Sequence, residues 1–171
     1  YYFQAVGDNF AGTADGVILS FTTATAPDIA VEQPADNDLV DGADTVDIGG
    51  AATGQPVSKP FTLRNTGTAT LTGIAATVDG ANPSDFVVSA LPATLAAAGS
   101  TTCPVTLTPS VLAARSAALH LTSNDTDESS FDINLTGTGL TPYDGWAAGV
   151  GLTGPNSGPN DDFEGDGVTN L

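Results

Sequence analysis

Basic residues are scarce in this sequence: three lysines and arginines stand against 20 aspartates and glutamates, so the formal net charge is −17. A surface with that charge repels phosphate backbones, which argues against a nucleic-acid partner. Anionic membrane surfaces are disfavoured for the same reason. The charge therefore favours cations as partners.

The sequence also lacks long hydrophobic runs and methionine, and it has a single cysteine. No stretch approaches the ~20 apolar residues that span a bilayer, so we expect no membrane insertion. Without a methionine or a signal peptide, the chain is expected to be processed or to be an excerpt of a longer one. Cys103 has no partner for an internal disulfide, and we expect it to be a small buried side chain in a strand.

Groups that could perform catalysis are equally few. His120 is the only histidine, which excludes a two-histidine metal centre. We expect it in the middle of a strand, with no glycine-flanked nucleophile nearby, which argues against a Ser-His-Asp triad. The sequence therefore predicts a protein that is not an enzyme.

What the sequence does contain is a β-rich pattern. Hydrophobic residues make up 40% of it, which is enough for a core. Proline, glycine, threonine and valine recur every ~8–12 residues, as in β-sandwiches. Leu119 and Leu121 alternate with His120 and Thr122, as expected for a strand with one buried face. Strands are expected at residues 28–33, 45–48, 60–65, 69–78, 85–89, 101–108, 117–123 and 130–136, and a loop with a short turn at residues 91–98.

The middle of the chain resembles a known family. The runs PFTLRNTGTATLTG, DFVVS, TTCPVTLTPS, RSAALHLTSND and FDINLTGTG follow one another in this order. This succession resembles the choice-of-anchor D family, an immunoglobulin-like sandwich related to the Hydin-type and major-sperm-protein-like domains. The resemblance covers residues 27–141. It implies an all-β, antiparallel Ig-like β-sandwich that serves as a non-catalytic spacer or binding module of large secreted bacterial surface proteins.

Residues 1–26 are a separate piece, with extended runs at residues 1–6 and 16–23 that predict a β-hairpin. They are similar to the last two strands of a fibronectin type III domain. Two strands do not make a stable core alone, so Phe3, Val17, Leu19 and Phe21 need a further sheet. An upstream domain, a neighbouring subunit or the Ig-like domain could supply it. An open two-stranded edge also invites strand addition, so this segment is either a domain remnant or a donor hairpin.

Residues 142–171 are expected to form a linker followed by an irregular cation-binding loop. The stretch DDFEGDGVTNL is similar to thrombospondin type 3 and dockerin loops, which implies calcium as the cofactor. Calcium takes ~6–8 oxygen ligands, and side chains at alternate positions of a tight loop point at one centre. The ligands implied at loop positions one, three, five, seven and nine are Asp162, Glu164, Asp166, the Val168 carbonyl and Asn170.

This loop departs from the family pattern in two places. Glu164 stands where the family prefers the shorter aspartate, and the acid expected at position twelve lies beyond Leu171. Another subunit, further residues or water would have to supply the missing ligand. The alternative interpretation is a solvated acidic tail.

Two further acidic clusters are interpreted as exposed turns. The alternative is that they bind a second cation, and in the first cluster this cation would lie between two domains. The first cluster comprises Asp36, Asn37, Asp38 and Asp41, and the second comprises Asn124, Asp125, Asp127 and Glu128. Tyr143 and Trp146 are interpreted either as a carbohydrate-stacking platform or as a packing anchor against the sandwich or a neighbour.

These features together predict a non-catalytic, extracellular or cell-surface structural and interaction module of a bacterial protein, stabilised by calcium. Its partners would be copies of itself or neighbouring domains of the same polypeptide. The unpaired hairpin and the incomplete loop suggest head-to-tail assembly into a filament, because contacts that do not close on themselves give filaments. Truncation from a longer chain explains the same two features. The alternative function is a glycan- or surface-binding accessory module of a secreted multidomain enzyme.

Overall fold

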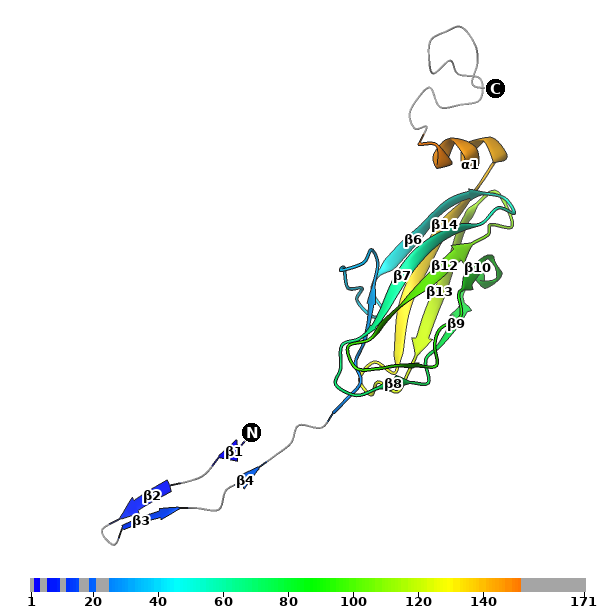
Figure 1. Cartoon of the computed structure of the whole chain (residues 1–171). Coiled ribbons are helices and arrows are strands. Elements are labelled where there is room, and N and C mark those ends of the chain that lie inside the picture. Colours follow the sequence, from blue (N-terminus) through cyan, green and yellow to red (C-terminus); the bar gives the residue numbers. More distant parts are fainter. Residues whose placement is uncertain (1, 4–5, 10–11, 16–18, 21–24, 152–171) are drawn as a thin grey trace.

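The computed structural model describes residues 2–3, 6–9, 12–15, 19–20 and 25–151 (Figure 1). The predicted N-terminal hairpin is present as two small two-stranded antiparallel sheets, in which β1 pairs with β4 and β2 pairs with β3. These strands are β1 (Tyr2–Phe3), β2 (Val6–Asn9), β3 (Gly12–Asp15) and β4 (Leu19–Ser20).

Two four-stranded sheets form the predicted β-sandwich. The first has the order β10-β12-β7-β5 and the second has the order β6-β14-β13-β9. The first sheet comprises β5 (Ile29–Glu32), β7 (Val57–Asn65), β10 (Phe86–Val88) and β12 (Ser100–Leu107). The second comprises β6 (Thr45–Ala52), β9 (Ala75–Asp79), β13 (Ala114–Thr122) and β14 (Ser130–Leu140).

The strand pairs are antiparallel with one exception. Strand β6 runs parallel to β14, from the Asn134–Thr45 pair to the Leu140–Ala52 pair. A register shift interrupts this pairing between Thr136 and Thr138. The antiparallel Ig-like β-sandwich expected from the sequence is confirmed, and the pair of β6 with the last strand is its one parallel pair.

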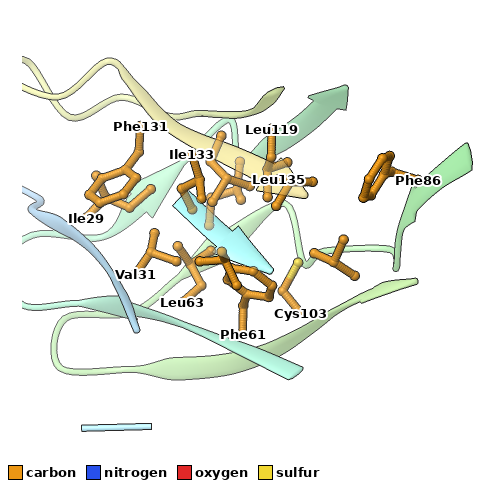
Figure 2. Close-up of a cluster of buried hydrophobic side chains, with 14 of the residues drawn as sticks. Ile29, Val31, Phe61, Leu63, Phe86, Cys103, Leu119, Phe131, Ile133 and Leu135 are labelled. Carbon is orange, nitrogen blue, oxygen red and sulfur yellow. The ribbon is translucent and has the colours of Figure 1, made fainter. Parts of the chain in front are cut away.

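The core lies between the two sheets (Figure 2). Alternate side chains of each strand point inward, so Phe61 and Leu63 of β7 lie opposite Ile133 and Leu135 of β14. Burial of such side chains contributes about 25 cal/mol per Å² of apolar surface removed from water. Cys103 belongs to the same cluster, and burial raises the pKa of its thiol to about 11. The expectation of a small buried cysteine in a strand is therefore confirmed.

The prediction of a single strand at residues 69–78 is wrong. Two strands occupy it, β8 (Leu71–Thr72) and β9, separated by Gly73 with φ of 66°. A residue with this φ turns the chain out of the extended conformation. Strand β8 pairs instead with β11 (Thr94–Leu95), a short strand in the segment that was expected to be a loop.

A linker was expected to begin at residue 142, but helix α1 (Pro142–Gly149) follows β14 instead. Thr141 caps this helix: its Oγ1 accepts a hydrogen bond from the Asp144 nitrogen at 3.1 Å and donates one to Asp144 Oδ2 at 2.6 Å. The helix lies against β6, where a Cβ on Gly145 would be 2.8 Å from the Ala52 nitrogen. Besides α1, the structure has a short 3-10 turn, η1 (Pro83–Asp85). No helix in the described part of the chain is long and apolar enough to cross a membrane.

Candidate functional site

The RNTG turn after β7 joins the start of the sandwich to its body. Asn65 is 1% exposed, and its side chain makes four hydrogen bonds. Its Oδ1 accepts from the nitrogens of Asp28 and Gly67, and its Nδ2 donates to the carbonyls of Ala69 and Leu95. Gly67 passes so close to the incoming chain that a Cβ there would lie 2.6 Å from the Asp28 nitrogen. The start of β5 is therefore held firmly at this end of the sandwich.

Three carboxylates meet at the same end, which we call the acidic end. Asp28, Asp125 and Glu128 each place an oxygen within 4.8 Å of the others. Asp125 is buried, and its Oδ2 accepts a hydrogen bond from the Ile29 nitrogen at 2.8 Å. Burial alone would raise the pKa of Asp125, but this hydrogen bond and those from residues 127 and 128 lower it overall.

Glu128 has the opposite pKa shift. Its pKa is raised by burial first and then by the negative charges of Asp125, Asp41, Asp28 and Asp127. Carboxylate oxygens at this spacing are the donor type that calcium prefers. The sequence singled out Asp125 and Glu128 but missed Asp28, which lies 97 residues before Asp125 and is brought to it by the Ile29–Asp125 hydrogen bond.

The remaining members of the predicted acidic clusters have local structural contacts. Asn124 accepts a hydrogen bond from the Thr72 nitrogen at 2.6 Å and so secures β8. Asp36 and Asp38 are exposed in the turn after β5, as expected. Asp41 accepts a hydrogen bond from the Asp132 nitrogen at 2.6 Å. The predicted calcium ligands Asp162, Glu164, Asp166, Val168 and Asn170 lie outside the described residues.

An ion pair between Arg115 and Asp85 fixes the loop between β12 and β13. Asp85 is 3% exposed, and its Oδ2 accepts hydrogen bonds from Arg115 Nε at 2.6 Å and from the Ser110 nitrogen at 3.1 Å. Burial would raise the pKa of Asp85, but these hydrogen bonds and the guanidinium charge lower it overall. Asp85 therefore ties η1 to the opposite loop.

His120 lies on the outer face of β13 between two carboxylates. Its Nδ1 is 2.7 Å from Asp132 Oδ1 on β14, and its Nε2 is 3.1 Å from Asp79 Oδ1 on β9. The hydrogen bond to Asp132 and the contact with Asp79 raise the pKa of His120. The first contact is a well-aligned hydrogen bond, whereas the second is an ion-pair contact at a poorer angle. The residue links three neighbouring strands, in agreement with a surface strand histidine.

Tyr143 and Trp146 come together on α1. Their ring centroids are 5.7 Å apart with planes at 49°, and Trp146 is 53% exposed. Ala147 on the same helix is buried instead. The helix thus keeps a small side chain for the sandwich and presents an aromatic pair beside it.

Two hollows without charged lining residues lie at the edges of the sandwich. A groove of about 500 Å³ lies between β9 and β10, which are edge strands of the two sheets. We call it the edge groove; its lining residues are Ile74, Ala75, Ala76, Val78, Phe86, Val87, Val88, Ser89, Ala90 and Leu91. A second hollow of about 520 Å³ lies between α1 and the β6–β7 turn. Smaller hollows do have charged lining residues, such as the one of about 280 Å³ formed by Glu32, Asp36, Asp38, Arg64 and Thr66.

Comparison with known proteins yields one family. The family model described as "HYDIN/CFA65/VesB-like, Ig-like domain" matches residues 40–138. A search of curated protein sequences yields no match.

Several solved structures match parts of this chain. PapD-like domain 7 of human CEP192 is 12% identical over 73% of this chain and 94% of that one, with a TM-score of 0.49. A protein of unknown function from Porphyromonas gingivalis W83 is 15% identical over 80% of both chains, with a TM-score of 0.47. The Vibrio cholerae VesB protease is 21% identical over 56% of this chain and 30% of that one, with a TM-score of 0.43.

Proposed function

Because this chain belongs to the HYDIN/CFA65/VesB-like Ig-like domain family, we propose that it is a non-catalytic structural and interaction module of an extracellular bacterial surface protein. One observation carries the proposal. In the part of the chain that the structure describes, four polar residues are buried, Glu32, Asn65, Asp85 and Asp125, and all bind backbone groups or a neighbouring arginine. An enzyme would direct some such groups at a substrate cavity, since perturbed carboxyls are the usual acids and bases. Here they hold loops and strands in place: even Glu32, which lines a hollow of about 280 Å³ with Asp36, Asp38 and Arg64, accepts hydrogen bonds from the Asp36 nitrogen and from Arg64.

A first test concerns rigidity. A structural module should unfold in one cooperative transition, and its amides in β7, β12, β13 and β14 should exchange only through global unfolding. Hydrogen exchange followed by mass spectrometry measures this directly. Rapid exchange within these four central strands would contradict a structural role.

Calcium is the second part of the proposal, and we assign it to the loop formed by residues 162–170. The charge of −17 supports a cation partner, as does the alternation of Asp162, Glu164 and Asp166. Isothermal titration calorimetry of the whole chain with calcium should show binding that Asp162→Asn and Asp166→Asn remove together. Glu128→Gln is the control, since it removes one charge from the acidic end. If only Glu128→Gln abolished binding, calcium would bind at the acidic end and the loop assignment would be wrong.

Head-to-tail assembly is the third part. It is supported by β1 and β4, which form a two-stranded sheet with no third strand among the described residues. A two-stranded sheet is marginal in water and gains from further strands. Light scattering over a range of protein concentrations, with calcium and with a chelator, should show growth beyond a dimer. A monomer at all concentrations in calcium would overturn this part while leaving the structural role intact.

A glycan-binding accessory module is the second candidate function, favoured by the exposed ring of Trp146 and its contact with the half-buried ring of Tyr143. Sugar rings stack on such aromatic faces. Trp146 is the only tryptophan, so its fluorescence reports on α1 alone. Titration with cello-, chito- and xylo-oligosaccharides should shift this emission if the helix binds glycans. An unchanged spectrum with all three classes would remove this candidate.

A further inference from the structure

The edge groove exposes part of the core. Ala76, Val78, Val88 and Leu91 are only partly buried, although all four pack against the core cluster. They account for four of the six partly buried apolar residues that touch that cluster. The sandwich is therefore least well covered on this side.

The opposite side of the sandwich is closed by its own chain. The Leu39 nitrogen donates to the Val31 carbonyl at 2.8 Å, and Glu32 pairs with Asp38, so the turn after β5 covers that edge strand. The β6 edge is flanked by α1, which packs against Ala52. Strands β9 and β10 each have a single hydrogen-bonded neighbour strand, so their outer backbone groups can accept another strand.

Charge restricts what can occupy this groove. None of its ten lining residues is charged, in a molecule whose net charge is −17. Segments that carry carboxylates would be costly to bury there without partners, which leaves the uncharged runs of a second copy, such as residues 16–27 and 145–160. Residues 16–27 (GVILSFTTATAP) form an uncharged run outside the sandwich strands. Within it, Val17, Leu19 and Phe21 alternate in the period that presents three apolar side chains to one face of a strand.

Residues 16–23 are long enough to pair with strand β9. Residues 16–23 in extended conformation span about 26 Å at roughly 3.3 Å per residue. Strand β9 has five residues, which corresponds to about 17 Å at the same rise. The segment is thus long enough to pair along the whole of β9 and to leave residues on either side.

We propose that the edge groove of one copy receives residues 16–23 of a second copy as an added strand, with Val17, Leu19 and Phe21 directed at the exposed core. This rests on the proposed head-to-tail assembly and identifies the two surfaces that make it. Backbone hydrogen bonds to the β9 edge supply affinity, and the apolar side chains supply register. Because donor and groove are different surfaces of the same chain, the contact is heterologous and propagates.

The test uses two variants of the whole chain that each destroy one surface. Leu19→Glu places a charge on the donor, and Val87→Glu places one in the groove at a side chain that is 60% exposed, so the fold tolerates it. Each variant alone should be monomeric by size-exclusion chromatography with light scattering. Mixed together they should form a one-to-one dimer and nothing larger, because only one donor and one groove remain intact. Val111→Glu, at a valine that is 50% exposed in the β12–β13 loop, is the matched control and should assemble like the unmodified chain.

The outcomes separate the two proposals. If the unmodified chain assembles and Val87→Glu assembles equally well, the groove is not the receiving surface, although head-to-tail assembly stands. If Val111→Glu blocks assembly instead, the α1 end of the sandwich is the contact. If a Leu19→Cys, Val87→Cys double variant forms a disulfide within one monomeric chain, the groove is filled by its own copy and the proposal is wrong. A monomer under all conditions removes both the assembly and the inference drawn from it.

Discussion

Replacing Asn65 by aspartate tests whether a single side chain holds the start of the sandwich. The change exchanges one NH2 group for an oxygen and alters the shape very little. The two hydrogen bonds that Asn65 accepts, from the Asp28 and Gly67 nitrogens, can persist in the variant. The two that it donates, to the carbonyls of Ala69 at 2.8 Å and Leu95 at 3.0 Å, cannot, because an ionised carboxylate has no donor.

The size of the effect follows from these two contacts. Each buried carbonyl left without a donor costs about 1–3 kcal/mol, so the pair costs about 2–6 kcal/mol. Repulsion between the carboxylate and the two oxygens adds to this. A domain of this size is stable by about 5–15 kcal/mol, so Asn65→Asp should remove a large share of its free energy of unfolding.

The penalty should depend on pH. Burial and the two facing carbonyls raise the pKa of a carboxyl at position 65 above its unfolded value of about 3.9. Below that value the protonated group can donate one hydrogen bond, so the penalty is smallest there. It grows as pH rises through the raised folded pKa, so the variant should lose more free energy of unfolding at pH 8 than at pH 4.

Urea unfolding followed by circular dichroism, at several pH values, measures both quantities. Asn82→Asp is the control, since Asn82 is half-exposed and its Nδ2 donates only to the adjacent Ala81 carbonyl. It should change the free energy of unfolding by less than about 0.5 kcal/mol. An Asn65→Asp variant as stable as this control, with no pH dependence, would refute the role given to Asn65.

Three further outcomes are expected. Asp85→Ala should lower the free energy of unfolding, measured in urea, by about 3–5 kcal/mol. The reason is that the Arg115 side chain, which is only 12% exposed, loses its carboxylate partner. A loss below about 1 kcal/mol would contradict this. His120→Gln should lower the free energy of unfolding below pH ~6.5 and converge with the unmodified chain as pH rises through the raised pKa of His120; a constant difference would exclude the ion-pair contribution. The Cys103 thiol, buried with a pKa of about 11, should not react with a disulfide reagent at pH 8 until the chain is unfolded.

Strands with strict alternation could be predicted from the sequence, because alternation is a local property. Leu119 and Leu121 are buried on β13 as expected, and His120 between them faces outward. The strand lengths were underestimated where small residues continue the pattern. Strand β14 was expected to end at residue 136 but continues to Leu140 through a Gly-Thr-Gly stretch, which carries too little hydrophobic contrast to indicate a strand.

Helix α1 was missed although a local signal exists. Thr141, Pro142 and Asp144 form the pattern of a capped helix start, with proline in the first turn and an acid three residues after the cap. The glycines that follow weaken the helical pattern, and contact with β6 compensates for this. Tertiary packing thus decided what local propensity left open.

The candidate site could be predicted only in part. Asp125 and Glu128 lie close together in sequence and were recognised as an acidic cluster. Asp28 joins them through the pairing of β5 with β7 and the hydrogen bond from Ile29 to Asp125, which are long-range events. The edge groove was not visible at all, since it exists only because β9 and β10 end up as the outer strands on the same side.

The parallel pairing of β6 with β14 determines how the sandwich would carry tension. Strand β5 begins and β14 ends at opposite ends of the sandwich (Figure 1), so a pull on the chain acts along its length. Neighbouring parallel strands drawn apart at opposite ends slide past each other lengthwise. Their backbone hydrogen bonds, from the Asn134–Thr45 pair to the Leu140–Ala52 pair and interrupted at the register shift between Thr136 and Thr138, then share the load instead of opening one after another. A chain of such modules would resist stretching by the pairing of β6 with β14 in each module.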